Sequence, residues 1–268
     1  MSFLKTSLAL KYVVFPFIRI VCHFFGDLIK YPRHIGLIMD GNRRFAAASG
    51  LASEMHGHSR GFEKLKEVLE WILQLPSDCC SEVSVFAFST ENFSRSAAEV
   101  SGLMELFELK VKCFLALFTC TFFQLKELML PGNLEFLREN RVKIGVLGQL
   151  SLLPLEIQDL AAAVHQETSR YEPLRTLNVL MAYSSEAELA SCRDGTAQQG
   201  IFEDHLWVKS DVDLLIRTSG EVRLSGFLCY QVNQRTMIKF LCKFWPELSV
   251  QDLLCCLFEF FLFSYFRR

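Results

Sequence analysis

Short β-rich runs that alternate with longer amphipathic stretches constrain the fold of this chain more than any other feature. The expected strands are His34–Met39, Glu82–Phe88, Val142–Leu147, Thr176–Met181 and Val212–Ile216. Apolar residues recur at helical spacing over Gly57–Leu75, Ala97–Leu117, Leu155–Arg170 and Ser184–Cys192. Pro154 is well placed to open the third of these helices. The alternation predicts an α/β fold whose mainly parallel sheet is covered by helices on both faces.

Polar residues gather directly after three of the expected strands. The three segments are Asp40–Arg44, Ser89–Arg95 and Arg217–Ser225. In parallel α/β sheets, ligands bind at the loops that follow the carboxyl ends of the strands. We therefore expect three segments that are distant in the sequence to converge on one site.

The Asp40–Arg44 segment has the chemistry of a site for a magnesium-bound diphosphate. Asp40 offers a carboxylate ligand, and Gly41 permits an unusual turn. The next three residues, Asn42, Arg43 and Arg44, supply amide and guanidinium donors. Arginine binds phosphate bidentately. For this string alone, a solvated turn with two surface arginines is an equal alternative.

His58 lies in the run His56–Gly61, which precedes a helical pattern. We expect a helix N-terminus here, whose free N–H groups receive a phosphate with His58 as a further donor. A structural or surface histidine is the alternative, and the spacing of His56 and His58 does not suit a metal site.

The Ser89–Arg95 segment offers hydroxyls, an amide and a guanidinium after the second strand. Ser89, Asn92 and Arg95 are candidates to bond a second diphosphate or its developing charge. A helix cap formed by a hydroxyl and a nearby acid is the alternative.

The Arg217–Ser225 segment is the most informative of the three. Arg217, Arg223 and Ser225, together with Gly220, suit a compact cradle for a diphosphate. A surface loop with one internal ion pair is the alternative.

Composition excludes several other classes of protein. Lys and Arg total 28 against 30 acidic residues, so no basic field favours nucleic acid as a partner. The 10 cysteines form no C-x-x-C pair or regular framework, so we predict no zinc site, a reducing compartment, and cysteines that act as small buried apolar residues. No G-x-x-x-x-G-K-[ST] loop supports a nucleotide hydrolase.

Residues 1–30 are apolar and aromatic, but charged residues interrupt them at Lys5, Lys11, Arg19 and Asp27. No run approaches the roughly 18 residues that a simple membrane span needs. We expect an amphipathic segment that lies in a membrane interface, followed by one domain over residues 31–268. A helix packed on that domain and a signal peptide are the alternatives.

Four strings, taken together and in order, resemble the cis-prenyltransferase family, which comprises the undecaprenyl and dehydrodolichyl diphosphate synthases. The eukaryotic dehydrodolichyl branch is the more similar. The strings occupy residues 34–44, 57–62, 86–95 and 213–225, and the similarity runs from about His34 to Pro246.

The resemblance implies a mostly parallel six-stranded sheet flanked by helices, with a hydrophobic tunnel for a growing prenyl chain. It also implies that isopentenyl diphosphate is joined to an allylic diphosphate such as farnesyl diphosphate. Repetition gives a long-chain Z-polyprenyl (dehydrodolichyl) diphosphate for dolichol synthesis. Candidates for the tunnel wall, for which ordinary core packing is the alternative, are Leu103, Met104, Leu106 and Phe107.

Roles for the polar residues also follow from the resemblance. Asp40 holds Mg²⁺ and the allylic diphosphate, helped by the rest of Asp40–Arg44, and His58 lies near the reacting diphosphates. Ser89 and Asn92 assist ionisation or proton removal. The remaining contacts are Arg95 to the allylic diphosphate, and Arg217, Arg223 and Ser225 to isopentenyl diphosphate.

Substitutions at three places depart from the family pattern. Glu54 stands where many relatives carry an arginine. Cys229-Tyr230 replaces Leu-Trp in a Leu-Trp-Gln string, and Thr236 stands near the place of an acid found in bacterial homodimers. The last change removes one possible metal ligand.

Two stretches also depart in length. Cys113–Gln124 reads as an uncharged, phenylalanine-rich insertion, and residues 184–212 read as a shortened interval. We expect an atypical splice product or a diverged paralogue with impaired folding. The alternative function is a non-catalytic, prenyltransferase-like subunit that binds a partner, a membrane or a lipid diphosphate.

The sequence ends at Arg267-Arg268 without the R-x-G tail that bacterial homodimers share between subunits. This predicts a heteromer with a Nogo-B-receptor-like subunit, or a homo-oligomer. The resemblance to the dehydrodolichyl branch further implies peripheral attachment to the cytoplasmic face of the endoplasmic reticulum membrane. The apolar stretch Leu253–Phe266 fits an interface, a membrane contact or core.

Overall fold

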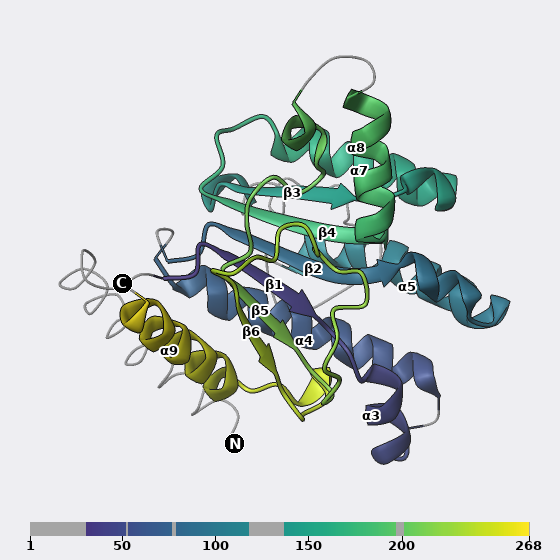
Figure 1. Ribbon diagram of the computed structural model, residues 1–268. Coiled ribbons are helices and arrows are strands. Elements are labelled where there is room, and N and C mark those ends of the chain that lie inside the picture. The colour runs from purple at the N-terminus through teal and green to yellow at the C-terminus, as the bar shows by residue number, and fades with distance from the viewer. Residues whose placement is uncertain (1–30, 52, 77–78, 118–136, 197–200, 268) are drawn as a thin grey trace.

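A computed structural model describes residues 31–51, 53–76, 79–117, 137–196 and 201–267. Six strands form one sheet in the order β3-β4-β2-β1-β5-β6 (Figure 1), and every neighbouring pair is parallel. The predicted parallel sheet is therefore confirmed. The strands are β1 (His34–Ile38), β2 (Glu82–Ser89), β3 (Val142–Leu147), β4 (Arg175–Tyr183), β5 (Leu214–Arg217) and β6 (Met237–Phe240).

The helices confirm the predicted alternation, with shifts at their ends. The α-helices are α3 (Asn42–Ala48), α4 (Glu54–Gln74), α5 (Ala97–Leu117), α7 (Leu155–Thr168), α8 (Ser185–Thr196) and α9 (Val250–Phe266). Short 3₁₀ turns are η2 (Thr90–Ser94), η3 (Leu150–Leu152), η4 (Phe202–His205) and η5 (Trp245–Glu247). Periodicity had not identified α3, α9 or β6.

The start of α4 corrects one prediction. The helix begins at Glu54, after Ser53, rather than at Gly57. His58 therefore lies within the helix, where N–H groups bond to carbonyls of the preceding turn. The expected phosphate site at a helix N-terminus beside His58 was wrong, and His58 contributes only its side chain.

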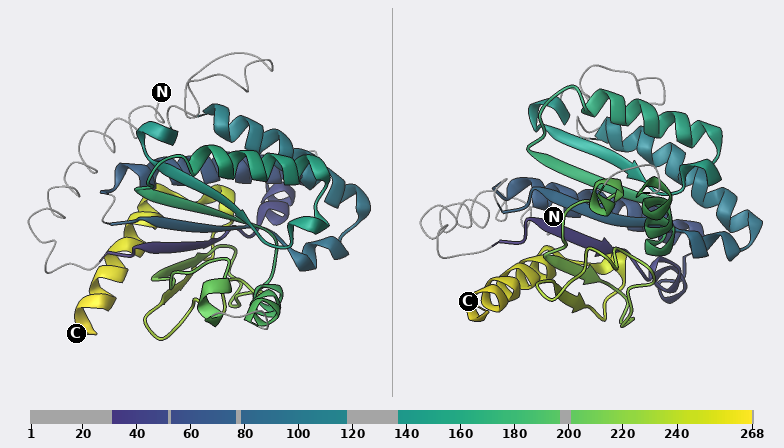
Figure 2. Two further views of the ribbon diagram at one scale, coloured as in Figure 1. Left: turned by 90° about the horizontal axis from the view of Figure 1, so that it is seen from above. Right: turned by 45° about the horizontal axis from the view of Figure 1, so that its top comes forward.

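Apolar side chains alternate between the two faces of the sheet, as the period of a strand requires. On one face, α4, α7 and α9 pack against Ile35, Leu37, Val83 and Val85 in the main core. On the other face, Val208 of the segment after η4 joins a second cluster with Leu180 and Phe227. Figure 2 shows α5 and α7 side by side along the sheet. With both faces covered, the open edge at the carboxyl ends of the strands is left for a site.

Helix α9 is partly core. Its inner face buries Leu253, Cys256 and Phe260, whereas Phe258 and Phe266 are exposed. A membrane span requires about 20 apolar residues in a helix, and in the described ranges none of the helices meets the length and hydropathy that crossing a bilayer demands.

The cysteine prediction holds only in part. Cys79, Cys80, Cys192 and Cys256 are buried, as expected of small apolar side chains. Three others are exposed, so the expectation of burial was wrong for Cys229, Cys242 and Cys255.

The interval predicted to be shortened, residues 184–212, is anchored by one buried carboxylate. Glu188 is fully buried on α8 and accepts hydrogen bonds from the Tyr183 hydroxyl (2.5 Å) and from the amides of Trp207 (2.9 Å) and Val208 (3.0 Å). The Gln231 side-chain amide donates a fourth, at 3.2 Å. This network ties α8 to the segment after η4. Most of the predicted insertion at Cys113–Gln124 lies outside the described residues.

Candidate active site

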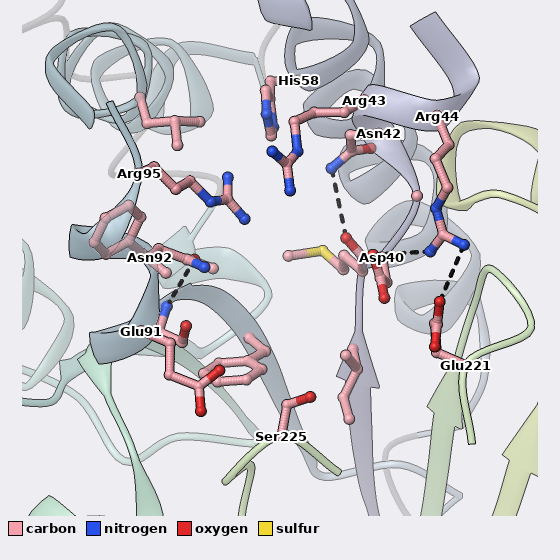
Figure 3. A pocket seen from close by; sticks show the side chains of 18 of the residues that line it. Asp40, Asn42, Arg43, Arg44, His58, Glu91, Asn92, Arg95, Glu221 and Ser225 are labelled. Carbon is pink, nitrogen blue, oxygen red and sulfur yellow. Dashed lines mark hydrogen bonds and ion pairs between the residues drawn. The ribbon is translucent and has the colours of Figure 1, made fainter. Parts of the chain in front are cut away.

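A polar cavity of about 790 Å³ lies at the carboxyl ends of β1, β2 and β5. Side chains from the loops after these strands and from α3 and α4 face one another across it (Figure 3). All twelve site residues predicted from the sequence line it: Asp40, Gly41, Asn42, Arg43, Arg44, His58, Ser89, Asn92, Arg95, Arg217, Arg223 and Ser225.

Gly41 makes the turn that places this cavity. It has a left-handed backbone with φ of 101° and caps the N-terminus of α3. A Cβ there would lie 2.7 Å from the Phe244 ring and 2.9 Å from the Ser219 Cβ. Both the backbone angle and the close approach require glycine, so the turn aims Asp40 into the cavity while α3 begins immediately after it.

The Asp40 carboxylate is held by two arginines. Its Oδ2 accepts a hydrogen bond from Arg217 Nη2 at 2.8 Å, and its Oδ1 lies 3.5 Å from Arg44 Nη2. Burial alone would raise the pKa of Asp40, but the Arg217 hydrogen bond and charge, helped by Ser219, hold it below its ordinary value. The carboxylate is therefore ionised at neutral pH.

Arg217 joins two of the loops. Its side chain is only 4% exposed, and its Nη1 donates to the Arg223 carbonyl (2.5 Å) and the Ser225 hydroxyl (2.9 Å). Through its third bond, from Nη2 to Asp40, the guanidinium fixes the β5 loop against the β1 loop. Arg223, in contrast, is 60% exposed and pairs with Glu221.

Asn42 is pressed against α4 at two glycines. A Cβ on Gly57 would lie 2.2 Å from the Asn42 carbonyl oxygen, and a Cβ on Gly61 would lie 2.2 Å from Asn42 Oδ1. Among the described residues, that buried Oδ1 has no hydrogen-bond partner. The two glycines thus form a notch that seats the start of α3.

Ser89 and Asn92 form a cap at the start of η2. The Ser89 amide donates to Asn92 Oδ1 at 3.1 Å, so the cap uses an amide rather than the nearby acid of the alternative. Both residues also line the cavity. The cap fixes the Asn92 carbonyl oxygen and leaves its amide nitrogen to other acceptors.

His58, Arg43 and Arg95 meet on another wall (Figure 3). Glu99 of α5 lies among them, with its Oε1 at 2.9 Å from Arg95, 3.8 Å from Arg43 and 4.0 Å from His58. Burial, and then the charge of Arg95, lower the pKa of His58 to about 4, so its ring is neutral at pH 7. Glu99 was not predicted from the sequence, because Arg95 precedes α5 and the spacing of four is not that of two residues in one helix.

Three further acids line the cavity, and the sequence analysis gave none of them a role in binding. They are Glu54, Glu91 and Glu221, and Glu221 pairs with Arg44 at 3.2 Å. Thr236 is not among the residues described as lining it, and its hydroxyl donates to the Val212 carbonyl at 2.6 Å.

Comparison with known proteins decides the family. The sequence matches the family described as "Putative undecaprenyl diphosphate synthase" over residues 38–262. It is 37% identical to a dehydrodolichyl diphosphate synthase complex subunit of Mus musculus over 260 residues, covering 88% of this chain and 70% of that one. A corresponding subunit of Schizosaccharomyces pombe is 36% identical, with 82% and 81% covered. The chain belongs to the undecaprenyl diphosphate synthase family of cis-prenyltransferases.

Solved structures agree on the fold of this family. Lavandulyl diphosphate synthase from Lavandula x intermedia, in complex with dimethylallyl diphosphate, superposes with a TM-score of 0.69 at 24% identity, covering 85% of this chain and 94% of that one. A probable undecaprenyl diphosphate synthase from Campylobacter jejuni gives 0.65 at 23% identity, covering 87% and 96%. The fold that the resemblance implied is therefore confirmed.

The donors present suit Mg²⁺ in the manner expected for cis-prenyltransferases. Mg²⁺ is bound through one or two carboxylates, with substrate phosphates and water completing its shell. Among the residues that the structure describes, no cluster of three or more His, Cys, Asp or Glu forms a metal cage. The ionised Asp40, which faces the cavity, fits the single-carboxylate mode.

An apolar cavity of about 140 Å³ adjoins the polar one and shares Met39, Asn42, His58 and Leu103 with it. Leu106 also lines this apolar cavity, as predicted for a tunnel. Met104 instead packs in a separate cluster with Phe88 and Ile157, so its assignment to the tunnel was wrong. The side chain of Phe107 lies outside what the structure describes.

Proposed function

We propose that this chain extends an allylic diphosphate with isopentenyl diphosphate units to give a long-chain Z-polyprenyl diphosphate for dolichol synthesis. One observation carries the proposal. All twelve site residues predicted from the motifs line a single cavity, and that cavity adjoins an apolar one. A diphosphate head and a hydrocarbon tail would each find a matching surface.

The allylic diphosphate would bind between Asp40 and the wall formed by Arg43, His58 and Arg95. Mg²⁺, held by Asp40, would neutralise part of the diphosphate charge. The guanidinium groups of Arg43 and Arg95 would stabilise the negative charge that grows on diphosphate as its bond to the allylic carbon breaks. The double bond of isopentenyl diphosphate forms the new carbon–carbon bond, and loss of a proton completes the unit. Ser89 and Asn92 would assist ionisation or proton removal.

Isopentenyl diphosphate would bind near Arg223 and Ser225. The exposed Arg223 has donors available to a phosphate, apart from its pair with Glu221. Arg217 is already bonded to Asp40, Arg223 and Ser225. It would therefore act partly by holding the other groups in place.

The apolar cavity would receive the first part of the prenyl chain. A cavity near 150 Å³ holds a ligand about the size of benzene, so 140 Å³ corresponds to about one isoprene unit. Elongation would require α4 and α5 to separate further.

We further propose that the chain works with a Nogo-B-receptor-like subunit, or as a homo-oligomer, at the cytoplasmic face of the endoplasmic reticulum membrane. The mouse and fission-yeast relatives are subunits of a dehydrodolichyl diphosphate synthase complex, which supports an assembly. The apolar, cationic residues 1–30 support peripheral membrane contact. Liposome flotation of the full chain and of a chain beginning at Tyr31 tests this role, because the shorter chain should no longer float.

Incorporation of radiolabelled isopentenyl diphosphate onto farnesyl diphosphate tests the activity. We expect incorporation that requires magnesium, rises with the partner subunit and is lost in Asp40→Ala. Asp159→Ala, on an exposed position of α7, is the matched control and should behave as the wild type. Absence of incorporation under every condition would reject the enzyme.

A non-catalytic subunit is the second candidate, because Glu54 places a negative charge in the cavity where many relatives carry an arginine. Such a subunit would bind pyrophosphate without incorporating isopentenyl diphosphate. Glu54→Arg separates the two candidates. In an enzyme limited by this charge, the substitution should lower KM for the diphosphate substrates.

A further inference from the structure

Two arginines and a histidine converge on one wall of the polar cavity from three elements that are separate in the sequence. Arg43 belongs to α3, His58 to α4, and Arg95 to the junction of η2 and α5. Two guanidinium groups close together repel one another, and the repulsion grows as water is excluded. Something must hold them in place before an anion arrives.

Glu99 is the group that meets all three. Its Oε1 lies 2.9 Å from Arg95 Nη1, 3.8 Å from Arg43 Nη1 and 4.0 Å from His58 Nε2. Its side chain is 14% exposed. Its three partners are among the described residues that line the polar cavity, whereas Glu99 is not. The carboxylate therefore lies behind the surface that a diphosphate would touch.

An ordinary role at the start of α5 accounts for only part of this arrangement. The Glu99 amide donates to the Ser96 hydroxyl at 3.3 Å, and an acid in the first turn suits the helix dipole. A helix cap does not require the carboxylate to meet side chains from α3 and α4. Among the described residues, buried His58 Nε2 has no hydrogen-bond partner, and Glu99 provides an acceptor nearby if the ring moves slightly.

We propose that Glu99 is a positioning residue that holds Arg43, His58 and Arg95 together as one diphosphate-binding surface. This inference rests on the proposed function. It assigns Glu99 no contact with substrate. The contacts at 3.8 and 4.0 Å are longer than hydrogen bonds, so Glu99 acts on Arg43 and His58 through its charge at short range and on Arg95 through a direct bond.

The direction in which anion affinity changes when Glu99 is neutralised separates a positioning role from a purely electrostatic effect of its charge. Glu99 is negative and lies close to the site, so removing its charge should tighten anion binding if charge alone matters. If Glu99 positions the arginines, removing it should weaken binding, because the two cations move apart. Outer partners of ligand-binding groups typically change affinity by about tenfold or more.

The test is calorimetric titration of inorganic pyrophosphate, with magnesium present, into the full chain. We expect Glu99→Gln to bind about tenfold more weakly than wild type, the low end of the range for outer partners. Glu105→Gln is the matched control, since Glu105 is an exposed acid on the same helix whose carboxylate bonds Ser101. In the elongation assay, Glu99→Gln should raise KM for the allylic diphosphate more than it lowers kcat.

If wild type binds pyrophosphate, two results would overturn the role of Glu99 without affecting the proposed function. In the first, Glu99→Gln binds pyrophosphate as tightly as wild type; in the second, it binds more tightly. Failure of the wild type to bind pyrophosphate would instead reject the proposed function. Should Glu99→Gln not fold, Glu99→Asp serves the same purpose. The aspartate keeps the charge but has a shorter side chain. Positioning therefore predicts weaker binding of pyrophosphate, whereas charge alone predicts an unchanged affinity.

Discussion

Gly61 offers the sharpest test of how the fold positions the site. Its place in α4 faces Asn42, and a Cβ there would lie 2.2 Å from Asn42 Oδ1, where ordinary contacts begin near 3.4 Å. In Gly61→Ala the Asn42 side chain must therefore retreat by about 1 Å, a displacement that can lower catalysis about 100-fold. Asn42 lines both cavities, so diphosphate and prenyl chain would both be affected.

Stability should change much less than activity. Alanine in place of glycine favours a helix by about 1 kcal/mol, and overpacking a tight contact lowers stability by about 1–3 kcal/mol. The two effects leave Gly61→Ala between unchanged and about 2 kcal/mol less stable. Urea unfolding measures the stability, and incorporation of labelled isopentenyl diphosphate measures the activity.

Gly102→Ala is the matched control in α5. A Cβ there would meet only the flexible end of Met55, with Sδ at 3.2 Å and Cε at 3.4 Å. We expect Gly102→Ala to keep wild-type activity and to gain a little helix stability. If Gly61→Ala were as active as Gly102→Ala, the notch on α4 would not position Asn42, and the reasoning would be refuted.

Three further predictions concern charge. The pKa of His58 is lowered to about 4 in the folded protein. As the pH falls below about 6.5, this histidine is protonated in the unfolded chain but not in the folded one. The free energy of unfolding therefore decreases between about pH 6.5 and pH 4. Urea unfolding should show wild type losing about 2 kcal/mol more than His58→Gln between pH 7 and pH 5. Glu188→Gln should lower unfolding free energy by about 3 kcal/mol, because buried donors lose a charged acceptor; an unchanged urea midpoint would contradict that anchoring role. Arg217→Lys should reduce kcat/KM about 100-fold, since lysine lacks the two-pronged guanidinium that bonds Asp40 and Ser225 at once. Wild-type kcat/KM for this variant in the elongation assay would contradict that role.

The convergence of the three polar segments was predictable because parallel strands bring their carboxyl ends to one edge. Asp40, Asn92 and Arg223 follow strands that are distant in the sequence, yet they line one cavity. The alternation of strands and helices specifies that outcome without any knowledge of side-chain contacts.

Other features depend on contacts that a pattern does not contain. Gly41 and the polar run after it look like a turn, although α3 starts at Asn42 because the helix caps on a left-handed glycine. Strand β6 is four residues long at the edge of the sheet, too short for its period to stand out. The roles of Glu99 and of the notch at Gly57 and Gly61 depend on contacts with residues of other helices, which the sequence pattern does not specify.

The same notch bears on how the cavity responds to a substrate. The Asp40 carbonyl accepts the Trp245 amide at 3.0 Å, and the Trp245 indole donates to the Gly61 carbonyl at 2.6 Å. With Asn42 seated on Gly57 and Gly61, these contacts join the β1 loop, the start of α3 and α4 into one closely packed wall of the cavity. Closure around a diphosphate would therefore have to come from residues outside this wall, such as Asn92 of η2.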